Sequence, residues 1–404
     1  MPQELLRASA SLFGDKKMGY TSDDDMLNQM TVNGKRGRID MVKTTAPVHT
    51  AGGWHLLTGL AGNPNAGTFP GTDLLFQSCW ETTGDGTVVI GPQHGGVVSP
   101  ATKHLLSIKG MLIAAAGAPW IAMLVDLQGY YRLTTTNVTG TGVRTLINSN
   151  TFTASSSSGL LITYTNDFNT LTKVRFSNSG GALPTGLSTL TDYWLVRVSS
   201  TTARVATSLA NAIAGTVVAY TDGGTGTHTV RIETRSGGVG NQALFVSQTA
   251  PTLGGPNLTA SAYDDVLSTP GAGTRAFQGT PNMGAAADAY ATRILHSGNA
   301  TGRYGPFLPL QAADTGVARV NTFTWSGGTP YTGSGVVALA IVKPIIEIPL
   351  PVTGILTERD LRSQLVSLPK IDDGACLQWI LFGTGATTTA SPFVTVAEYG
   401  WAGS

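Results

Sequence analysis

The sequence has few charged side chains, which make up 12% of its 404 residues. Average globular proteins carry about 25%. Hydrophobic residues still reach 41%, so the low charge does not indicate disorder, which requires low hydrophobicity together with high net charge. With 51 glycines, this composition favours an all-β protein with many tight turns. Charge depletion is also typical of surfaces that neighbouring proteins cover.

Net charge is nearly absent too, at +1. A specific nucleic-acid partner is therefore not expected, because such proteins display a basic surface. The one dense basic run, Lys35-Arg36-Gly37-Arg38, is interrupted by glycine and is interpreted as a solvated turn. The most apolar segment, residues 111–125, contains Gly117 and Pro119 and is shorter than the ~20 residues that cross a bilayer. It predicts core strands around a turn, and neither a membrane anchor nor a signal peptide is expected.

Cysteine is almost missing: Cys79 and Cys376 share no motif spacing, so we expect free thiols and no zinc site. The six histidines show no metal-ligand spacing; they are His49, His55, His94, His104, His228 and His296. No nucleophile elbow or phosphate-binding loop is present. The expectation is therefore a non-enzymatic protein with no catalytic, cofactor-binding or metal-binding residues.

Sugar chemistry remains an alternative. Glycoside hydrolysis needs two opposed carboxylates, and the dispersed acidic residues of this chain do not exclude such a pair. Six aromatic residues are candidates for stacking on sugars or for core packing, with the core favoured for most of them: Tyr130, Tyr131, Tyr193, Trp194, Trp325 and Trp401.

Short apolar runs between Gly/Pro turns predict strands along most of the chain. We divide it into an extended N-terminal arm (1–50), a first part of a main β-domain (51–150), an inserted small β-sandwich or barrel module (151–235) and a second part of the main domain (236–404). The main domain is expected to be a jelly-roll-like β-sandwich.

Three segments predict finer structure. Residues 208–214 predict a short helix capped by Ser208 and ended by Gly215. Residues 357–365 have the pattern of a second helix with Thr357 as its N-cap. In the apolar run 335–351, three prolines predict edge or extended positions, because proline cannot donate to a strand ladder.

The segment YWLVRVSSTTARVATSLANAIAGTVVAYTDGGTGTHTV, residues 193–230, resembles a small β-module of tailed-bacteriophage structural proteins. The matching residues are Ala206–Ala212, Asp222 and Gly224–Thr229. Three further stretches resemble a family of phage structural proteins: residues 50–71, 304–323 and 356–381. These resemblances imply a particle component that carries the module as an insertion.

The implied function is that of a virion structural protein, assembled in the host bacterial cytoplasm. The leading hypothesis is a capsid decoration or minor capsid protein that stabilises the head through subunit interfaces. Its expected partners are other virion proteins, above all the major capsid protein, and further copies of itself, with a trimer as one option. The alternatives are a tail, collar or fibre component that binds a host glycan receptor, a major capsid protein, and a polysaccharide-degrading enzyme.

Overall fold

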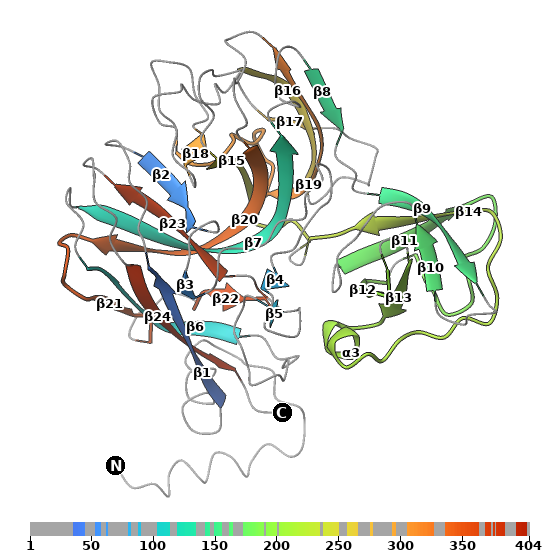
Figure 1. Ribbon diagram of the computed structural model, residues 1–404, viewed down its shortest axis with the longest axis horizontal. Helices are drawn as coiled ribbons and strands as arrows, with labels where there is room; N and C mark the ends of the chain where they lie inside the picture. Colours follow the sequence, from blue (N-terminus) through green and yellow to red (C-terminus); the bar gives the residue numbers. More distant parts are fainter. Residues whose placement is uncertain are drawn as a thin grey trace, which may run out of the picture.

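The computed structural model describes residues 35–44, 53–57, 62–63, 80–81, 88–89, 103–113, 119–134, 142–145, 149–155, 161–164, 173–189, 191–199, 202–234, 237–249, 257–265, 275–277, 293–295, 305–326, 336–362, 368–372, 375, 377–383 and 393–401. These residues form antiparallel sheets and one short helix, which confirms the predicted all-β sandwich class (Figure 1).

A curled sheet lies at the centre of the main body. Its strand order is β18 (Ile294–Leu295), β15 (Gln242–Thr249), β20 (Val336–Leu350), β7 (Trp120–Thr134), β23 (Leu377–Gly383) and β2 (Gly53–Leu56). The two edge strands approach each other, since an antiparallel bridge joins His55 to Arg293. One buried cluster takes side chains from all six strands, among them Leu56, Val125 and Ile294. The sheet is thus rolled around an apolar interior.

Strands β7 and β20 are each 15 residues long and pair along their whole length. Strand β15 pairs with β20 only over residues 336–342, so Pro344 and Pro349 lie where β7 is the one described strand neighbour. Proline has no N–H group to donate, and at these positions no hydrogen bond to β15 is lost. The two prolines therefore lie at edge positions of the described sheet, as predicted. A register shift at Pro344/Ile346 adds one residue to β20. As a result, Ile346 and Ile348 point away from the interior of the curled sheet.

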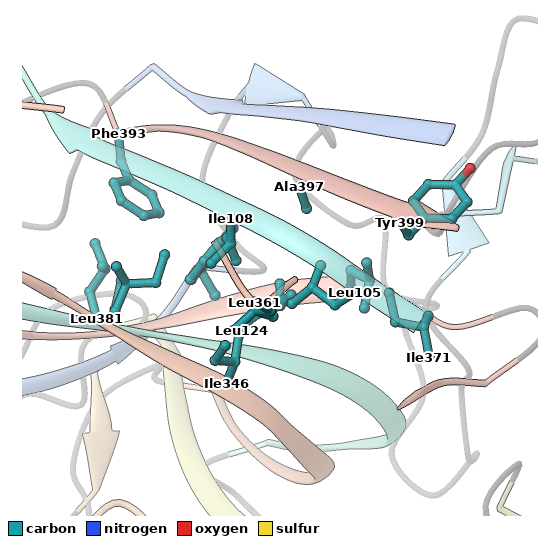
Figure 2. Close-up of a cluster of buried hydrophobic side chains, with 14 of the residues drawn as sticks. Leu105, Ile108, Leu124, Ile346, Leu361, Ile371, Leu381, Phe393, Ala397 and Tyr399 are labelled. Atoms are coloured by element: carbon teal, nitrogen blue, oxygen red, sulfur yellow. The ribbon is translucent and has the colours of Figure 1, made fainter. Parts of the chain in front are cut away.

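A second sheet, the facing sheet, covers the outer surface of the curled sheet. Its order is β21 (Thr357–Asp360), β6 (Lys103–Leu112), β24 (Phe393–Trp401), β1 (Lys35–Lys43) and β3 (Gly62–Asn63), and β22 (Lys370–Ile371) also pairs with β6. Figure 2 shows the apolar layer between the two sheets, to which β6 and β24 contribute Ile108 and Phe393 and the curled sheet contributes Leu124, Ile346 and Leu381.

Beyond the bulges, the curled sheet packs against an upper sheet with the order β17 (Arg275–Ala276), β16 (Asn257–Asp265), β19 (Val317–Ser326) and β8 (Gly142–Thr145). Tyr263 and Val320 of the upper sheet share a buried cluster with Phe245 and Ile341 of the curled sheet. A separate two-stranded ladder joins β4 (Trp80–Glu81) to β5 (Val88–Val89).

The chain between β8 and β15 forms a closed barrel, which stands to one side of the main body (Figure 1). Its strands are β9 (Ser149–Ser155), β10 (Leu161–Tyr164), β11 (Lys173–Ser179), β12 (Tyr193–Arg197), β13 (Thr202–Ala206) and β14 (Thr227–Ile232). Helix α3 (Leu209–Ile213) follows β13, and Ser208 caps it as predicted. The strands span residues 149–232, close to the limits of 151 and 235 set for the module.

Two local predictions are wrong. The expected turn at Lys35–Arg38 is the start of β1, because every residue of this strand pairs with β24. The expected helix at 357–365 begins as strand β21 instead, which pairs with β6, and the N–H of Leu361 donates to the carbonyl of Leu106. In both cases pairing with a distant strand outweighs a weak local preference.

The layer between the curled and facing sheets should dominate stability. Leu124 is fully buried there. We expect Leu124→Ala to lower the free energy of unfolding by about 2–5 kcal/mol, because it leaves a cavity in close-packed surroundings. Denaturant titration followed by circular dichroism measures this. Leu356→Ala, at a side chain that is 54% exposed, is the matched control, and an equal loss in both variants would contradict the assignment of the core.

Candidate interaction surfaces

The described residues contain no group of three or more His, Cys, Asp or Glu side chains that could hold a metal ion. His55, His104 and His228 are each buried. A ring nitrogen of His104 lies 3.5 Å from the carbonyl of Leu368, and one of His228 lies 3.0 Å from that of Gly223. These contacts place His104 and His228 in packing roles. His49, His94, His296, Cys79 and Cys376 lie outside the described residues.

The aromatic residues proposed for sugar stacking do not gather on one surface in the described part. Tyr193 is buried in the barrel core, where its ring centroid lies 5.3 Å from that of Phe176. Trp194 is half-buried and packs against α3. The side chains of the other four candidates lie outside the description. Among the described helices, none is long and apolar enough to span a bilayer.

The second half of the module motif is a clip at one end of the barrel. The carboxylate of Asp222 accepts hydrogen bonds from the N–H groups of Gly224 (2.8 Å) and Thr185 (3.1 Å) and from the Thr185 hydroxyl. The Thr225 hydroxyl accepts from the Ala182 N–H at 3.1 Å, and the Thr225 N–H donates to the Ala182 carbonyl at 2.8 Å. The motif loop is therefore fastened to the loop that follows β11.

Glycine is required at two points of this clip. Gly226 has φ +86°, and a Cβ there would lie 2.5 Å from the carbonyl oxygen of Ser179. Gly224 has φ +67°, and its Cβ would lie 2.8 Å from the His228 ring. L-residues other than glycine rarely adopt such backbone angles. Both positions combine backbone strain with lack of space, which explains why the motif needs glycine there.

The first half of the motif builds α3. The Ser208 hydroxyl accepts from the N–H of Asn211 at 3.0 Å, and the Asn211 amide donates to the Thr207 hydroxyl at 3.0 Å. Leu209 and Ala212 are buried against Trp194. In both halves, the described motif side chains support the fold of the barrel, and the sequence pattern alone did not reveal this role.

A chain of charges runs from the barrel to the main body. Asp192 forms ion pairs with Lys173 (2.7 Å) and Arg175 (2.5 Å). Partial burial by itself raises the pKa of Asp192, but hydrogen bonds from Arg175 and Lys173 outweigh it and leave that pKa below its ordinary value. Arg175 lies opposite Arg231 in the β11–β14 ladder. Together with the hydrogen bond to Asp192, the negative charge of Glu233 contributes to the raised pKa of Arg175, so the network continues across the barrel wall to that residue.

Glu233 completes this network at the junction. Its carboxylate pairs with Arg231 of the barrel at 2.8 Å and with Arg319 of β19 at 3.0 Å. The Glu233 and Arg319 side chains are each less than 10% exposed. Desolvation, followed by the nearby charge of Arg319, lowers the pKa of Arg231. One buried carboxylate therefore holds together two arginines from different parts of the fold.

Backbone contacts reinforce the junction. Residues 237–241 follow the barrel, and the Gly240 N–H donates to the Thr315 carbonyl at 2.9 Å. The Val317 N–H donates to the Asn241 carbonyl at 3.1 Å. Gly238 has φ +98°, and a Cβ there would lie 2.6 Å from the Cα of Ala318. The connection is thus a close-packed joint in its described part.

Four aliphatic side chains form an exposed group that we call the rim cluster: Ile113, Val352, Ile355 and Leu356. They are 44–56% exposed. The Gly354 N–H donates to the Leu112 carbonyl at 2.6 Å, which holds the turn at 351–356 against the end of β6. Exposed apolar patches typically mark a contact surface for another protein. The sequence reasoning did not identify these residues, since their exposure depends on tertiary structure.

No family model matches the chain, and no curated protein matches it. Among solved structures, it is similar to the infectious bursal disease virus VP2 subviral particle, with 8% identity and a TM-score of 0.18, over 91% of this chain and 81% of that chain. It is also similar to the infectious bursal virus derived T=1 particles, with 9% identity and a TM-score of 0.18, over 91% of this chain and 78% of that chain. Superpositions of this quality do not define a shared fold.

The Asp222 clip gives a pH-dependent prediction. Hydrogen bonds from the Thr185 side chain and from the Gly224 and Thr185 N–H groups hold the pKa of Asp222 below its ordinary value. A carboxyl whose pKa is lower in the folded state stabilises the fold above its unfolded pKa, about 4. That contribution is lost as the pH falls through the folded pKa. We expect Asp222→Asn to lower the melting temperature at pH 7 and to match the wild type at strongly acidic pH. A constant difference at every pH would contradict this.

The junction gives a second prediction. Glu233→Gln should lower the free energy of unfolding by about 3 kcal/mol, because it removes the carboxylate between two partly desolvated arginines. Limited proteolysis should then cut the barrel-to-body connection faster. Glu358→Gln, which affects an exposed pair with Lys109, is the control. Unchanged stability and cleavage in Glu233→Gln would show that the network does not hold the junction.

Proposed function

We propose that the chain is a structural component of a tailed-phage particle, a capsid decoration or minor capsid protein that stabilises the head through subunit interfaces. The rim cluster is the observation that carries the proposal. Its four aliphatic side chains are exposed where the turn at 351–356 meets the end of β6, whereas most of the large apolar residues in the described part are buried. Burial of such a patch against a neighbouring protein provides binding energy without any reactive group.

The inserted barrel supports the same function. Its motif resembles that of a tailed-phage virion module, and the described motif side chains maintain the clip and α3. When the described motif side chains of a module support its fold, the module is suited to a protein that works through contacts with its neighbours and not through a reaction. The low charge of the chain, 12%, also suits surfaces packed between neighbours. We propose the major capsid protein and further copies of this chain as the partners.

The copy number in purified particles tests this proposal. Hundreds of copies per particle, measured by quantitative gel or mass spectrometry against the shell subunit, are expected for a protein that repeats with the symmetry of the head. About six to eighteen copies would instead indicate a tail or collar component with the low symmetry of those structures. Absence from mature particles would refute a structural role.

A substitution in the rim cluster tests whether this surface is needed for incorporation into particles. Leu356→Asp should reduce incorporation into particles by about tenfold or more, because a desolvated charge at an apolar contact costs several kcal/mol. Val198→Asp, at a side chain of similar exposure on the barrel, should be incorporated normally. Equal incorporation of both variants would mean that the rim cluster is not the contact.

A further inference from the structure

The outer face of the barrel places two arginines directly opposite each other. Arg175 of β11 pairs with Arg231 of β14 in an antiparallel ladder. Both side chains lie on the outer face, because the alternate residues Phe176 and Val230 are buried in the barrel core. Opposite residues on one face of such a ladder have Cβ atoms about 4.5–5.5 Å apart, and like charges at this separation destabilise the ladder. An anion bound between the two arginines would relieve this repulsion.

The two carboxylates beside this arginine pair are each shared with another cation. Asp192 also pairs with Lys173 at 2.7 Å, and Glu233 also pairs with Arg319 at 3.0 Å. Desolvation and then the positive charge of Arg319 lower the pKa of Arg231, and this repulsion is larger than the attraction by the charge of Glu233. The surroundings of Arg231 therefore favour a further negative charge.

Both guanidinium groups keep donors for another acceptor. A guanidinium carries five N–H donors. Among the described contacts, Arg175 donates from Nε to Asp192, and Arg231 donates from Nε and Nη2 to Glu233. The Arg175 and Arg231 side chains are 42% and 24% exposed. An anion can therefore reach the other N–H groups from the solvent.

A row of hydroxyl groups borders the arginine pair on the same face. Ser177 and Thr229 lie opposite each other, two residues along from Arg175 and Arg231, and Thr151 of β9 lies opposite Thr229. Ser177 and Thr151 are exposed, and Thr229 is half-buried. Strand β14 is paired on both sides, with β9 and with β11. The row is thus part of a continuous barrel wall and not of a sheet edge.

We propose that this face binds a phosphate group, held between Arg175 and Arg231 and contacted by the hydroxyl groups of Ser177 and Thr229. Guanidinium groups suit this ligand, because their planar N–H donors match the oxygens of a phosphate and form charge-assisted hydrogen bonds. The next hydroxyl in the row, that of Thr151, can contact a hydroxyl group of a molecule that carries the phosphate. The ligand is therefore free phosphate or a phosphate ester of a polyol or sugar.

Calorimetric titration of the full chain tests the site with two probes, inorganic phosphate and glycerol 3-phosphate, at constant ionic strength set with sodium chloride. A dissociation constant of about 0.1–1 mM is expected for an exposed site of this kind. Tighter binding of glycerol 3-phosphate would identify an ester as the ligand, and equal binding would identify the phosphate group alone. Binding of neither probe would overturn the proposal. The site is separate from the rim cluster, so this failure would leave the proposed particle role intact.

A charge-removing variant tests the arginine pair. Arg175→Gln should raise the dissociation constant about tenfold or more, because one of the two guanidinium groups is lost. Asp192 keeps its ion pair with Lys173, so the barrel should stay folded, which circular dichroism checks. Arg204→Gln, at an exposed arginine of β13 in the same barrel, is the matched control and should bind both probes like the wild type. Equal affinities of the two variants would overturn the proposed site.

Two further variants separate a built site from general attraction to positive charge. Arg175→Lys keeps the charge but loses the planar set of donors, so it should also weaken binding. Ser177→Ala/Thr229→Val removes the two hydroxyl groups without changing any charge, and it should raise the dissociation constant severalfold. Wild-type affinity in both variants would show that only the net charge attracts the anion and would overturn the proposal.

Discussion

The antiparallel pairing of β7 with β20 is the interaction on which the rest of the main body depends. Both strands contribute to the apolar interior of the curled sheet and to the layer beneath the facing sheet. Further along, β20 also contributes Leu339 and Ile341 to the cluster shared with the upper sheet. One ladder therefore connects three packed layers. The extra residue that β20 carries between Pro344 and Ile346 reverses the side-chain alternation, so that both ends of β20 direct apolar residues to the same outer surface.

Much of this fold could be predicted from local patterns. Alternating apolar residues and Gly-rich turns predicted the barrel strands, and Ser208 and Gly215 predicted the limits of α3, because caps are local signals. Strands β1 and β21 could not be predicted in the same way. Each lies at or near an edge of the facing sheet and depends on a partner far away in sequence. Arg38 and Asp40 of β1 and Glu358 of β21 are exposed polar residues, so the apolar alternation that marks a strand is weak there.

The candidate surfaces were less predictable than the fold. The module motif was visible in the sequence, but the attachment of Asp222 to Thr185 depends on how two loops meet. The pairing of Glu233 with Arg319 joins residues from two parts of the fold, and no spacing rule connects them. The rim cluster resembles core sequence, since Ile355 and Leu356 differ from buried residues only in where the chain places them. The Asp222 clip, the Glu233 junction and the rim cluster each depend on tertiary packing, which local sequence patterns do not reveal.

The first and last strands of the barrel lie side by side, since Ser149 of β9 pairs with Arg231 of β14. The chain thus enters and leaves this module at neighbouring points, about 5 Å apart in an antiparallel ladder. A short turn could join those points and close the gap in the polypeptide. The insertion is therefore separable in a topological sense: a lineage could gain, lose or exchange it as one cassette while the host scaffold keeps its strand order.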